Sequence, residues 1–106
     1  EFKIFLLTGR NNRQSLIQQL KKLGIHHYFE NIFNVDTSEM VAQKKFHIEE
    51  HKPEFFIGDS EFDYFACKNS TTKFFCVSNG FRNKIFLESN NVPNINKNLK
   101  EVVKNL

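Results

Sequence analysis

Short apolar runs alternate along the chain with stretches in which apolar residues recur every three or four positions. The runs predict strands over residues 2–7, 32–35, 54–57 and 73–77. Helical spacing predicts helices between and after them, near residues 13–23, 37–51, 61–69, 82–89 and 96–105. Apolar strands that alternate with amphipathic helices are typical of a parallel sheet covered on both faces. We therefore expect an α/β fold with a three-layer, Rossmann-like sheet, in a single domain over residues 1–106.

Particular residues mark where the helices begin and which way they face. Asn11 or Asn12 can cap the first helix through its side chain, and Gly24 can end it by adopting a left-handed backbone. In the third helix, Phe62, Phe65 and Ala66 fall on the side that we expect to point into the core.

Composition narrows the possible partners and the compartment. The net charge is only +3, and basic residues are interleaved with acidic ones, so we expect no nucleic-acid partner. The apolar runs are far shorter than the roughly 20 residues of a membrane span, so we expect no membrane partner. Cys67 and Cys76 are isolated thiols, which favours buried, reduced cysteines and a cytoplasmic protein. The chain starts at Glu1 and runs straight into a strand, which suggests a fragment.

A pair of carboxylates follows the third predicted strand. The segment Gly58-Asp59-Ser60-Glu61-Phe62-Asp63 stands directly after the apolar run at 55–57. Two carboxylates at a strand end suit Mg²⁺, which takes a few carboxylates together with water and phosphate. The other interpretation is structural: Asp59 or Ser60 caps a helix, and Asp63 favours its positive end.

Two further segments could bind phosphate. Thr8-Gly9-Arg10 follows the first strand, where a hydroxyl, backbone amides and a guanidinium can hold an anion. An ordinary strand-to-helix turn is the alternative. Lys44 and Lys45 could offset phosphate charge, although either could also lie on a solvated helix face. Adjacent residues of a helix point in different directions, so at most one lysine should reach a site, and we favour Lys44.

The predicted fold would gather these segments at one rim. Thr8, Asp59 and Ser78 each stand at the carboxyl end of a predicted strand. Ligands of open α/β sheets bind outside those strand ends. Hydroxyl, lysine and paired aspartates then make a plausible site for a phosphate and a divalent cation.

Taken together, these segments resemble the haloacid dehalogenase (HAD) superfamily of phosphohydrolases, and its phosphoglycolate-phosphatase-like members in particular. Residues 6–10 look like the second motif of the family, Lys44 or Lys45 like the third, and residues 58–63 like the fourth. Residues 77–82 look like the strand and turn that follow the fourth motif. The resemblance covers nearly the whole chain and implies an HAD-like core domain.

The resemblance implies a Mg²⁺-dependent phosphatase that acts on a small phosphorylated metabolite through an aspartyl-phosphate intermediate. It assigns phosphate oxygens to Thr8 and to the lysine. It assigns Mg²⁺ to Asp59, and to Asp63 a role that supports the metal and the lysine.

One part of the family pattern is missing from this chain. The first motif, Asp-x-Asp-x-Thr or Val, does not occur before Thr8. In the family it ends the central strand, and the cap domain is often inserted between it and the second motif. We therefore expect the sheet to be incomplete here, the first strand and cap to be missing, and the attacking aspartate to lie outside the chain. The missing strand should come from the rest of the polypeptide or from another chain, and residues 1–106 alone should be inactive.

Other functions stay open at this point. A non-catalytic binding module could retain the fold without the chemistry, and a flavodoxin-like phosphoacceptor domain could use Asp59. The second is weakened because its acidic cluster should begin at the first strand, which carries Thr8 instead. A phosphonatase or dehalogenase of the same superfamily could use these residues too. The substrate cannot be predicted, because the cap that selects it in the family is absent.

Overall fold

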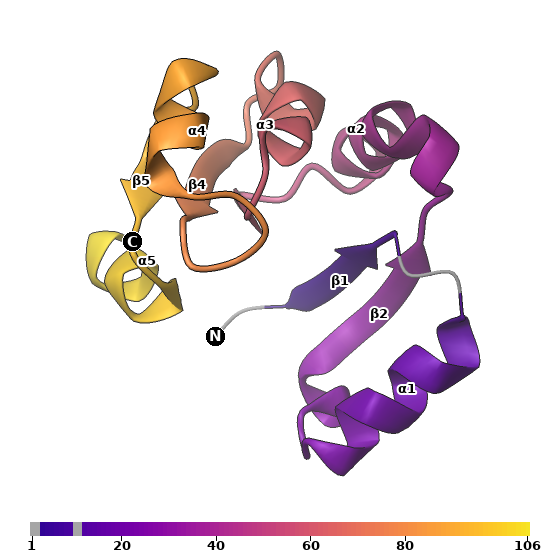
Figure 1. Cartoon of the computed structure of the whole chain (residues 1–106). Helices are drawn as coiled ribbons and strands as arrows, with labels where there is room; N and C mark the ends of the chain where they lie inside the picture. The colour runs from indigo at the N-terminus through magenta and orange to yellow at the C-terminus, as the bar shows by residue number, and fades with distance from the viewer. Residues whose placement is uncertain (1–2, 10–11) are drawn as a thin grey trace. The chain divides into compact units, whose positions relative to one another are not determined.

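A computed structural model describes residues 3–9 and 12–106, in which strands and helices alternate along the chain (Figure 1). The chain divides into two compact units, Glu1–Gln43 and Lys44–Leu106. Each unit carries its own parallel sheet, with β1 paired to β2 in the first and strand order β3-β4-β5 in the second. The predicted α/β class with parallel strands is confirmed. Among the described residues, no helix has the length and apolar character needed to cross a bilayer.

The first unit is a β-α-β arrangement. Strand β1 (Ile4–Thr8) leads through helix α1 (Arg13–Lys22) and a short 3₁₀ helix η1 (His26–Tyr28) to strand β2 (Phe29–Asn34). The strands are parallel, as a helical crossover between them requires. Helix α1 covers one face of the pair, where its apolar stripe meets both strands. The core residues are Leu16, Leu20 and Ile32, with Leu6, Ile17, Ile25 and Phe29 packed against them.

The ends of α1 follow the sequence prediction. The side chain of Asn12 accepts a hydrogen bond of 2.9 Å from the amide of Ser15, which caps the helix. Asn11, the other candidate cap, lies outside the described residues. Gly24 follows the helix with a φ of +74°, a left-handed conformation that glycine adopts without strain.

Strand β1 is less buried than its apolar sequence predicts. Ile4 and Phe5 are 45% and 38% exposed, whereas Leu6 and Leu7 are half-buried. The expectation of a buried strand was therefore wrong for its first half. Within the first unit, β1 pairs with β2 and packs against α1 through Leu6, which protects only part of its surface.

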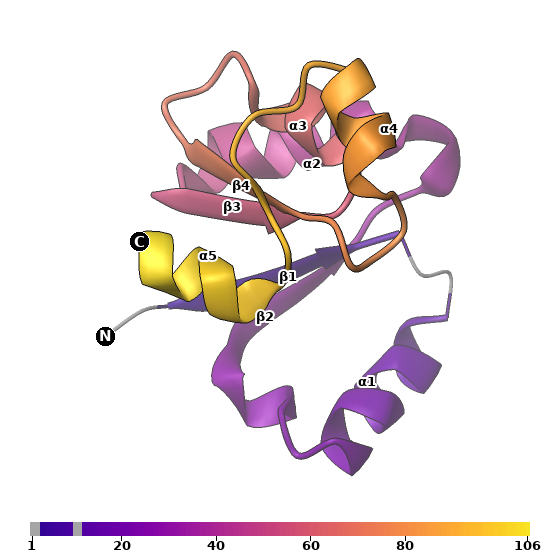
Figure 2. The same ribbon diagram turned by 60° about the vertical axis from the view of Figure 1, so that its left-hand side comes forward.

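The second unit has helices on both sides of its sheet (Figure 2). Its elements follow a 3₁₀ turn η2 (Thr37–Glu39) at the end of the first unit. They are α2 (Met40–His51, which begins in the first unit), β3 (Phe55–Gly58), α3 (Glu61–Cys67), β4 (Lys73–Val77), α4 (Lys84–Ser89), β5 (Ile95–Asn96) and α5 (Leu99–Asn105).

Alternate residues of β4 explain the layers. Phe75 and Val77 form one buried cluster with Val102 of α5. Phe74 points to the opposite face, where its ring centre lies 5.6 Å from that of Tyr64 in α3. The strand is buried on both faces, which is the pattern that continuous apolar strands predict.

Two details of the second unit differ from the sequence prediction. The last helix begins at Leu99, and Asn96, predicted to start it, instead lies in β5. The Asn96 side chain donates to the backbone carbonyl of Cys76 at 3.4 Å, and the backbone carbonyl of Asn96 accepts from the Ser78 amide at 2.8 Å, so Asn96 extends the sheet. Of the three residues of α3 expected to face inward, Ala66 is buried as predicted, whereas Phe62 and Phe65 are 40% and 37% exposed.

Candidate functional site

The turn between β3 and α3 is built by its own polar side chains. The hydroxyl of Ser60 accepts a hydrogen bond of 3.4 Å from the amide of Asp63, so Ser60 is the helix cap that the structural interpretation foresaw. In return, Oδ2 of Asp63 accepts from the Ser60 hydroxyl and from the Asp59 amide, both at 3.1 Å. Asp63 is therefore an organiser of the turn that presents Asp59.

Glycine is required at the start of this turn for reasons of space. A methyl group on Gly58 would lie 2.5 Å from Cβ of Asp63 and 2.6 Å from its Oδ2. Such contacts are far inside van der Waals distance, and Asp63 is fixed by its hydrogen bonds. The glycine thus lets the buried carboxylate pack directly on the backbone at the end of β3.

One of the two candidate lysines reaches this carboxylate. Nζ of Lys44, on α2, lies 2.7 Å from Oδ1 of Asp63, and both side chains are almost completely buried. Lys45 is exposed. The oxygens of Asp63 are thereby divided, one for the lysine and one for the turn. A buried charge pair of this kind fixes the position of the ammonium more than it adds stability.

Asp59 is held differently, through one oxygen only. Its Oδ2 accepts a hydrogen bond of 3.2 Å from the amide of Phe81, in the segment after β4. Gly80 packs against the same carboxylate, because a methyl group there would lie 2.5 Å from Oδ2. Among the described residues, none donates a hydrogen bond to Oδ1 of Asp59. The half-buried side chain therefore has a fixed orientation and one oxygen available to a ligand.

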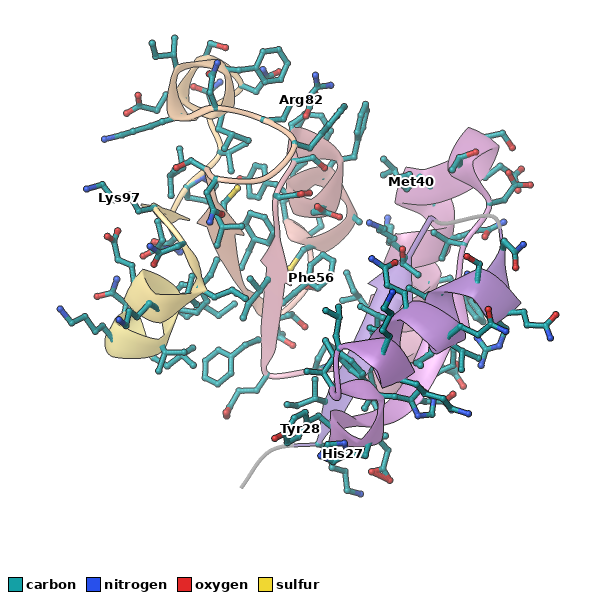
Figure 3. All side chains as sticks on the ribbon, turned by 60° about the horizontal axis from the view of Figure 1, so that its bottom comes forward. His27, Tyr28, Met40, Phe56, Arg82 and Lys97 are labelled. Atoms are coloured by element: carbon teal, nitrogen blue, oxygen red, sulfur yellow. The ribbon has the colours of Figure 1, made fainter. Side chains whose placement is uncertain are left out.

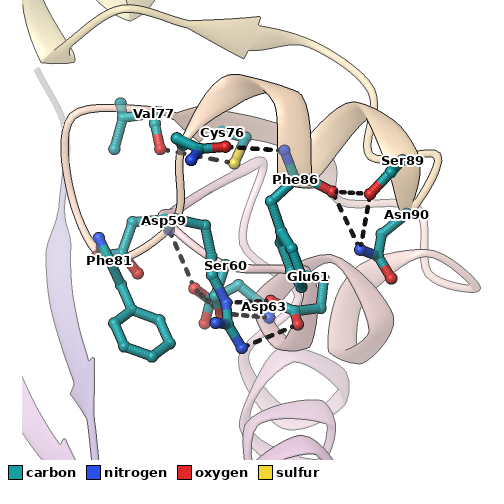
Figure 4. A network of polar contacts seen from close by, with 12 residues as sticks. Asp59, Ser60, Glu61, Asp63, Cys76, Val77, Phe81, Phe86, Ser89 and Asn90 are labelled. Carbon is teal, nitrogen blue, oxygen red and sulfur yellow. Dashed lines mark hydrogen bonds and ion pairs between the residues drawn. The ribbon is translucent and has the colours of Figure 1, made fainter.

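A second, partly buried ion pair stands beside this carboxylate, and no motif of the sequence predicted it. Nε of Arg82 lies 3.0 Å from Oε1 of Glu61, and Nη2 lies 3.2 Å from Oε2, which makes the contact bidentate. Glu61 and Asp59 lie in the same polar network (Figure 4). The pair joins residues 21 positions apart. The signal that could have found it is Glu61 itself, an acid at the start of a helix that needs a buried partner.

The carboxylates also affect the nearest thiol. Burial, together with the negative charges of Asp63, Asp59 and Glu61, raises the pKa of Cys76 to about 12. Burial also raises the pKa of Cys67. Both cysteines are buried and free. A thiol whose pKa is raised stays protonated near neutral pH, which disfavours nucleophilic chemistry at either side chain.

The predicted phosphate-binding residues belong to the first unit. Thr8 ends β1, and its carbonyl accepts a hydrogen bond of 2.8 Å from the amide of Val35. Gly9 is tightly packed, since a methyl group there would lie 2.8 Å from Cε of Met40. Arg10 lies outside the described residues. The structure thus brings Lys44, Asp59 and Asp63 together in one unit and places Thr8 and Gly9 in the other.

The local donor set for a cation is small. In the described part of the chain, no three His, Cys, Asp or Glu side chains gather closely enough to hold a metal ion. Mg²⁺ commonly uses one or two protein carboxylates and completes its shell with water and phosphate. The available oxygen of Asp59 fits that mode of binding, whereas Asp63 has both oxygens engaged.

Two solved structures resemble this fold. A hydrolase of the haloacid dehalogenase-like family from Streptococcus pneumoniae has a TM-score of 0.74 at 18% identity, covering 97% of this chain and 51% of its own. A protein from Lactobacillus delbrueckii subsp. bulgaricus, provisionally assigned as a phosphoglycolate phosphatase, has a TM-score of 0.66 at 19% identity, covering 94% and 44%. The chain thus spans about half the length of these proteins. No curated protein matches it significantly.

Sequence comparison places the chain in a family. The family described as haloacid dehalogenase-like hydrolase matches residues 1–77. The matched region includes the turn at 58–63 and the buried lysine that meets it. Because the match takes in well over half of the chain, the protein belongs to the haloacid dehalogenase-like hydrolase family.

Proposed function

We propose that this chain is part of a Mg²⁺-dependent phosphatase that hydrolyses the phosphate monoester of a small metabolite. The complete protein would act through an aspartyl-phosphate intermediate, and the attacking aspartate would come from outside these residues. Phosphoglycolate phosphatases, to which one similar fold is provisionally assigned, illustrate the substrate class. The cytoplasm suits two buried, reduced thiols.

The observation that carries the proposal is the contrast between the two aspartates. Asp59 has one oxygen fixed by the Phe81 amide and one that receives no hydrogen bond from the described residues. Asp63 has its oxygens bound to Lys44 and to the turn. Residues that served only to cap α3 would need neither an available oxygen on Asp59 nor a buried lysine on Asp63. Asp59 is therefore the proposed metal ligand. Asp63 supports the metal site indirectly, by holding Lys44 and the turn that carries Asp59.

Bound Mg²⁺ would neutralise charge on the transferring phosphoryl group and clamp its oxygens. The residues of this chain would hold and orient it. Asp59 offers a carboxylate oxygen whose direction is set before the ion arrives, which lowers the cost of binding. Lys44 brings a positive charge that Asp63 keeps in a single position, suited to a phosphate oxygen. Lys45, which is exposed, is the weaker candidate for this role.

Thr8, Gly9 and Arg10, which belong to the first unit, are the proposed phosphate-binding residues of the complete protein. Thr8 stands at the end of β1, followed by Gly9, Arg10 and the start of α1. A hydroxyl, backbone amides and a guanidinium in this order make an anion cradle. The tight packing of Gly9 on Met40 leaves no room for a side chain, which favours backbone contacts at this point.

A further strand would complete the fold. In the described sheets, β1 pairs with β2 and β3 pairs with β4, and no pairing joins β1 to β3. We propose that a strand from the rest of the polypeptide, or from another chain, carries the nucleophile and adds to these sheets. A non-catalytic binding module would use the same cation site but would lack an aspartate on that strand.

The test compares the chain alone with a polypeptide that also carries the missing strand. Residues 1–106 should bind Mg²⁺ in calorimetry but should not hydrolyse p-nitrophenyl phosphate. The longer protein should hydrolyse it, and EDTA should abolish the activity. Asp59→Asn should remove both binding and turnover, while Asp36→Asn, at an exposed aspartate, should change neither. Metal-dependent turnover by residues 1–106 alone would show that the nucleophile is not missing.

A further inference from the structure

The segment that orients Asp59 is itself held by a partly buried ion pair. Arg82 donates to both carboxylate oxygens of Glu61, from Nε to Oε1 at 3.0 Å and from Nη2 to Oε2 at 3.2 Å. Its guanidinium also lies over two aromatic rings, with 4.3 Å to the ring centre of Phe81 and 4.4 Å to that of Phe86. The side chain of Arg82 (labelled in Figure 3) therefore has contacts on its edge and on its faces, which leaves it one orientation.

The residues immediately before Arg82 are those that touch Asp59. The Phe81 amide donates to Oδ2 at 3.2 Å, and Gly80 packs against the same carboxylate. Residues 78–83 form neither helix nor strand, and at the start of the segment the Ser78 amide donates to the carbonyl of Asn96 at 2.8 Å. Near the other end, Arg82 holds the segment through its bidentate contact with Glu61.

The other partner of the pair lies on the turn that carries Asp59. Glu61 opens α3, two positions after Asp59, and its side chain is 7% exposed. The pair therefore ties the turn after β3 to the segment after β4, close in sequence to the Asp59–Phe81 hydrogen bond. A buried ion pair is seldom the most stabilising choice for two positions, whereas its bidentate geometry is well suited to fixing an orientation.

We infer that Glu61 and Arg82 are positioning residues, which hold residues 80–81 against Asp59 so that its second oxygen is directed at a divalent cation. The inference rests on the proposed function for the identity of that cation. It assigns no contact with substrate or metal to either residue. Partners of this kind around a metal ligand typically change metal affinity by about 10-fold to 100-fold when they are altered.

The experiment uses the longer polypeptide that also carries the missing strand. It has two independent readouts, Mg²⁺ affinity and hydrogen exchange. Arg82→Lys keeps the charge but loses the bidentate contact, and Glu61→Gln/Arg82→Gln leaves no buried charge unpaired if the first variant folds poorly. Mg²⁺ affinity by calorimetry should fall by about 10-fold. Hydrogen exchange of the Phe81 amide, followed by NMR, should accelerate by at least about 10-fold as its bond to Asp59 weakens.

The matched control is Asn83→Ala. Asn83 adjoins Arg82 and caps α4 by accepting from the Phe86 amide at 2.9 Å, but it does not contact Asp59. This variant should destabilise α4 while leaving Mg²⁺ affinity and Phe81 exchange unchanged. Equal effects in the control and in Arg82→Lys would reduce the pair to a structural role and overturn the inference.

Failure of the two proposals can be told apart. Wild-type protein that binds no Mg²⁺ would overturn the proposed function. Wild-type protein that binds Mg²⁺, with Arg82→Lys and the double variant unchanged in affinity and in Phe81 exchange, would overturn the positioning role alone.

Discussion

The ammonium of Lys44 lies 2.7 Å from Oδ1 of Asp63, and the two side chains are only 10% and 5% exposed. The pair joins α2 to the first turn of α3 and couples the predicted lysine to the predicted acidic turn. Removal of either partner would leave a buried charge without compensation, so substitution of either residue should destabilise the fold.

Removal of the lysine should destabilise the fold. Lys44→Ala leaves the Asp63 carboxylate buried beside no cation, which should lower the free energy of unfolding by about 3 kcal/mol. Lys45→Ala, at an exposed position, should change it by less than about 0.5 kcal/mol. Urea unfolding followed by circular dichroism measures both. Similar losses in the two variants would mean that the burial of Lys44 does not govern its contribution.

The two aspartates should separate metal binding from stability. Asp59→Asn should remove Mg²⁺ binding and leave the fold intact, because the amide oxygen can still accept from Phe81. Asp63→Asn should lower the free energy of unfolding by about 2 kcal/mol, because it leaves the Lys44 ammonium without a buried counter-charge. Calorimetric titration and urea unfolding of each variant give the two quantities. Intact Mg²⁺ binding by Asp59→Asn would remove this residue from the metal site.

Alkaline pH should reveal the environment of Cys76. Its pKa is about 12 in the folded protein against a reference value of 9.0, so the native state keeps a proton that the unfolded chain loses. The resulting stability is complete below pH 9.0 and is lost as pH rises toward 12, by about 1.4 kcal/mol per unit.

The comparison variant is Cys76→Ala, which has no thiol to titrate. Urea unfolding from about pH 8 to about pH 10.5 should show the wild type losing roughly 2 kcal/mol more than the variant. Parallel curves for the two proteins would mean that Cys76 titrates normally in the folded state.

The loss of stability on replacing a glycine with alanine should depend on the space around that glycine. Gly24→Ala places a methyl group in open space and costs only the left-handed backbone, about 1 kcal/mol. Gly58→Ala forces the methyl group against Asp63 and should cost about 3 kcal/mol, with displacement of the turn. Melting curves of the two variants provide the test. A loss in Gly58→Ala no larger than in Gly24→Ala would contradict the tight packing.

Local sequence signals predicted the elements around the site well. Ser60 caps α3 and Gly58 begins the turn, because both depend on residue types at fixed spacing. Strand β5 was missed, since its two residues are too few for a pattern and Asn is rare in strands. Its place is set by hydrogen bonds from residues about 20 positions away.

The least predictable parts of the site depend on contacts between distant segments. The spacing of residues on α2 could show that only one lysine would reach the site, but the choice of Lys44 required the position of α3. The Glu61–Arg82 pair gave no periodic signal, because Glu61 begins α3 and Arg82 lies in the irregular segment between β4 and α4. Phe62 and Phe65 seemed suited to the core, yet Glu61 and Asp63 occupy the inward positions at the start of α3.

The hydrogen bond from Phe81 to Asp59 spans 22 residues and therefore exists only in the folded chain. If Asp59 holds Mg²⁺ as proposed, the ion binds the native state and has little affinity for the unfolded one. Mass action then adds about 1.4 kcal/mol of stability when free Mg²⁺ reaches ten times its dissociation constant. The melting temperature of the protein, and its abundance in a cell, would then rise with the concentration of free Mg²⁺.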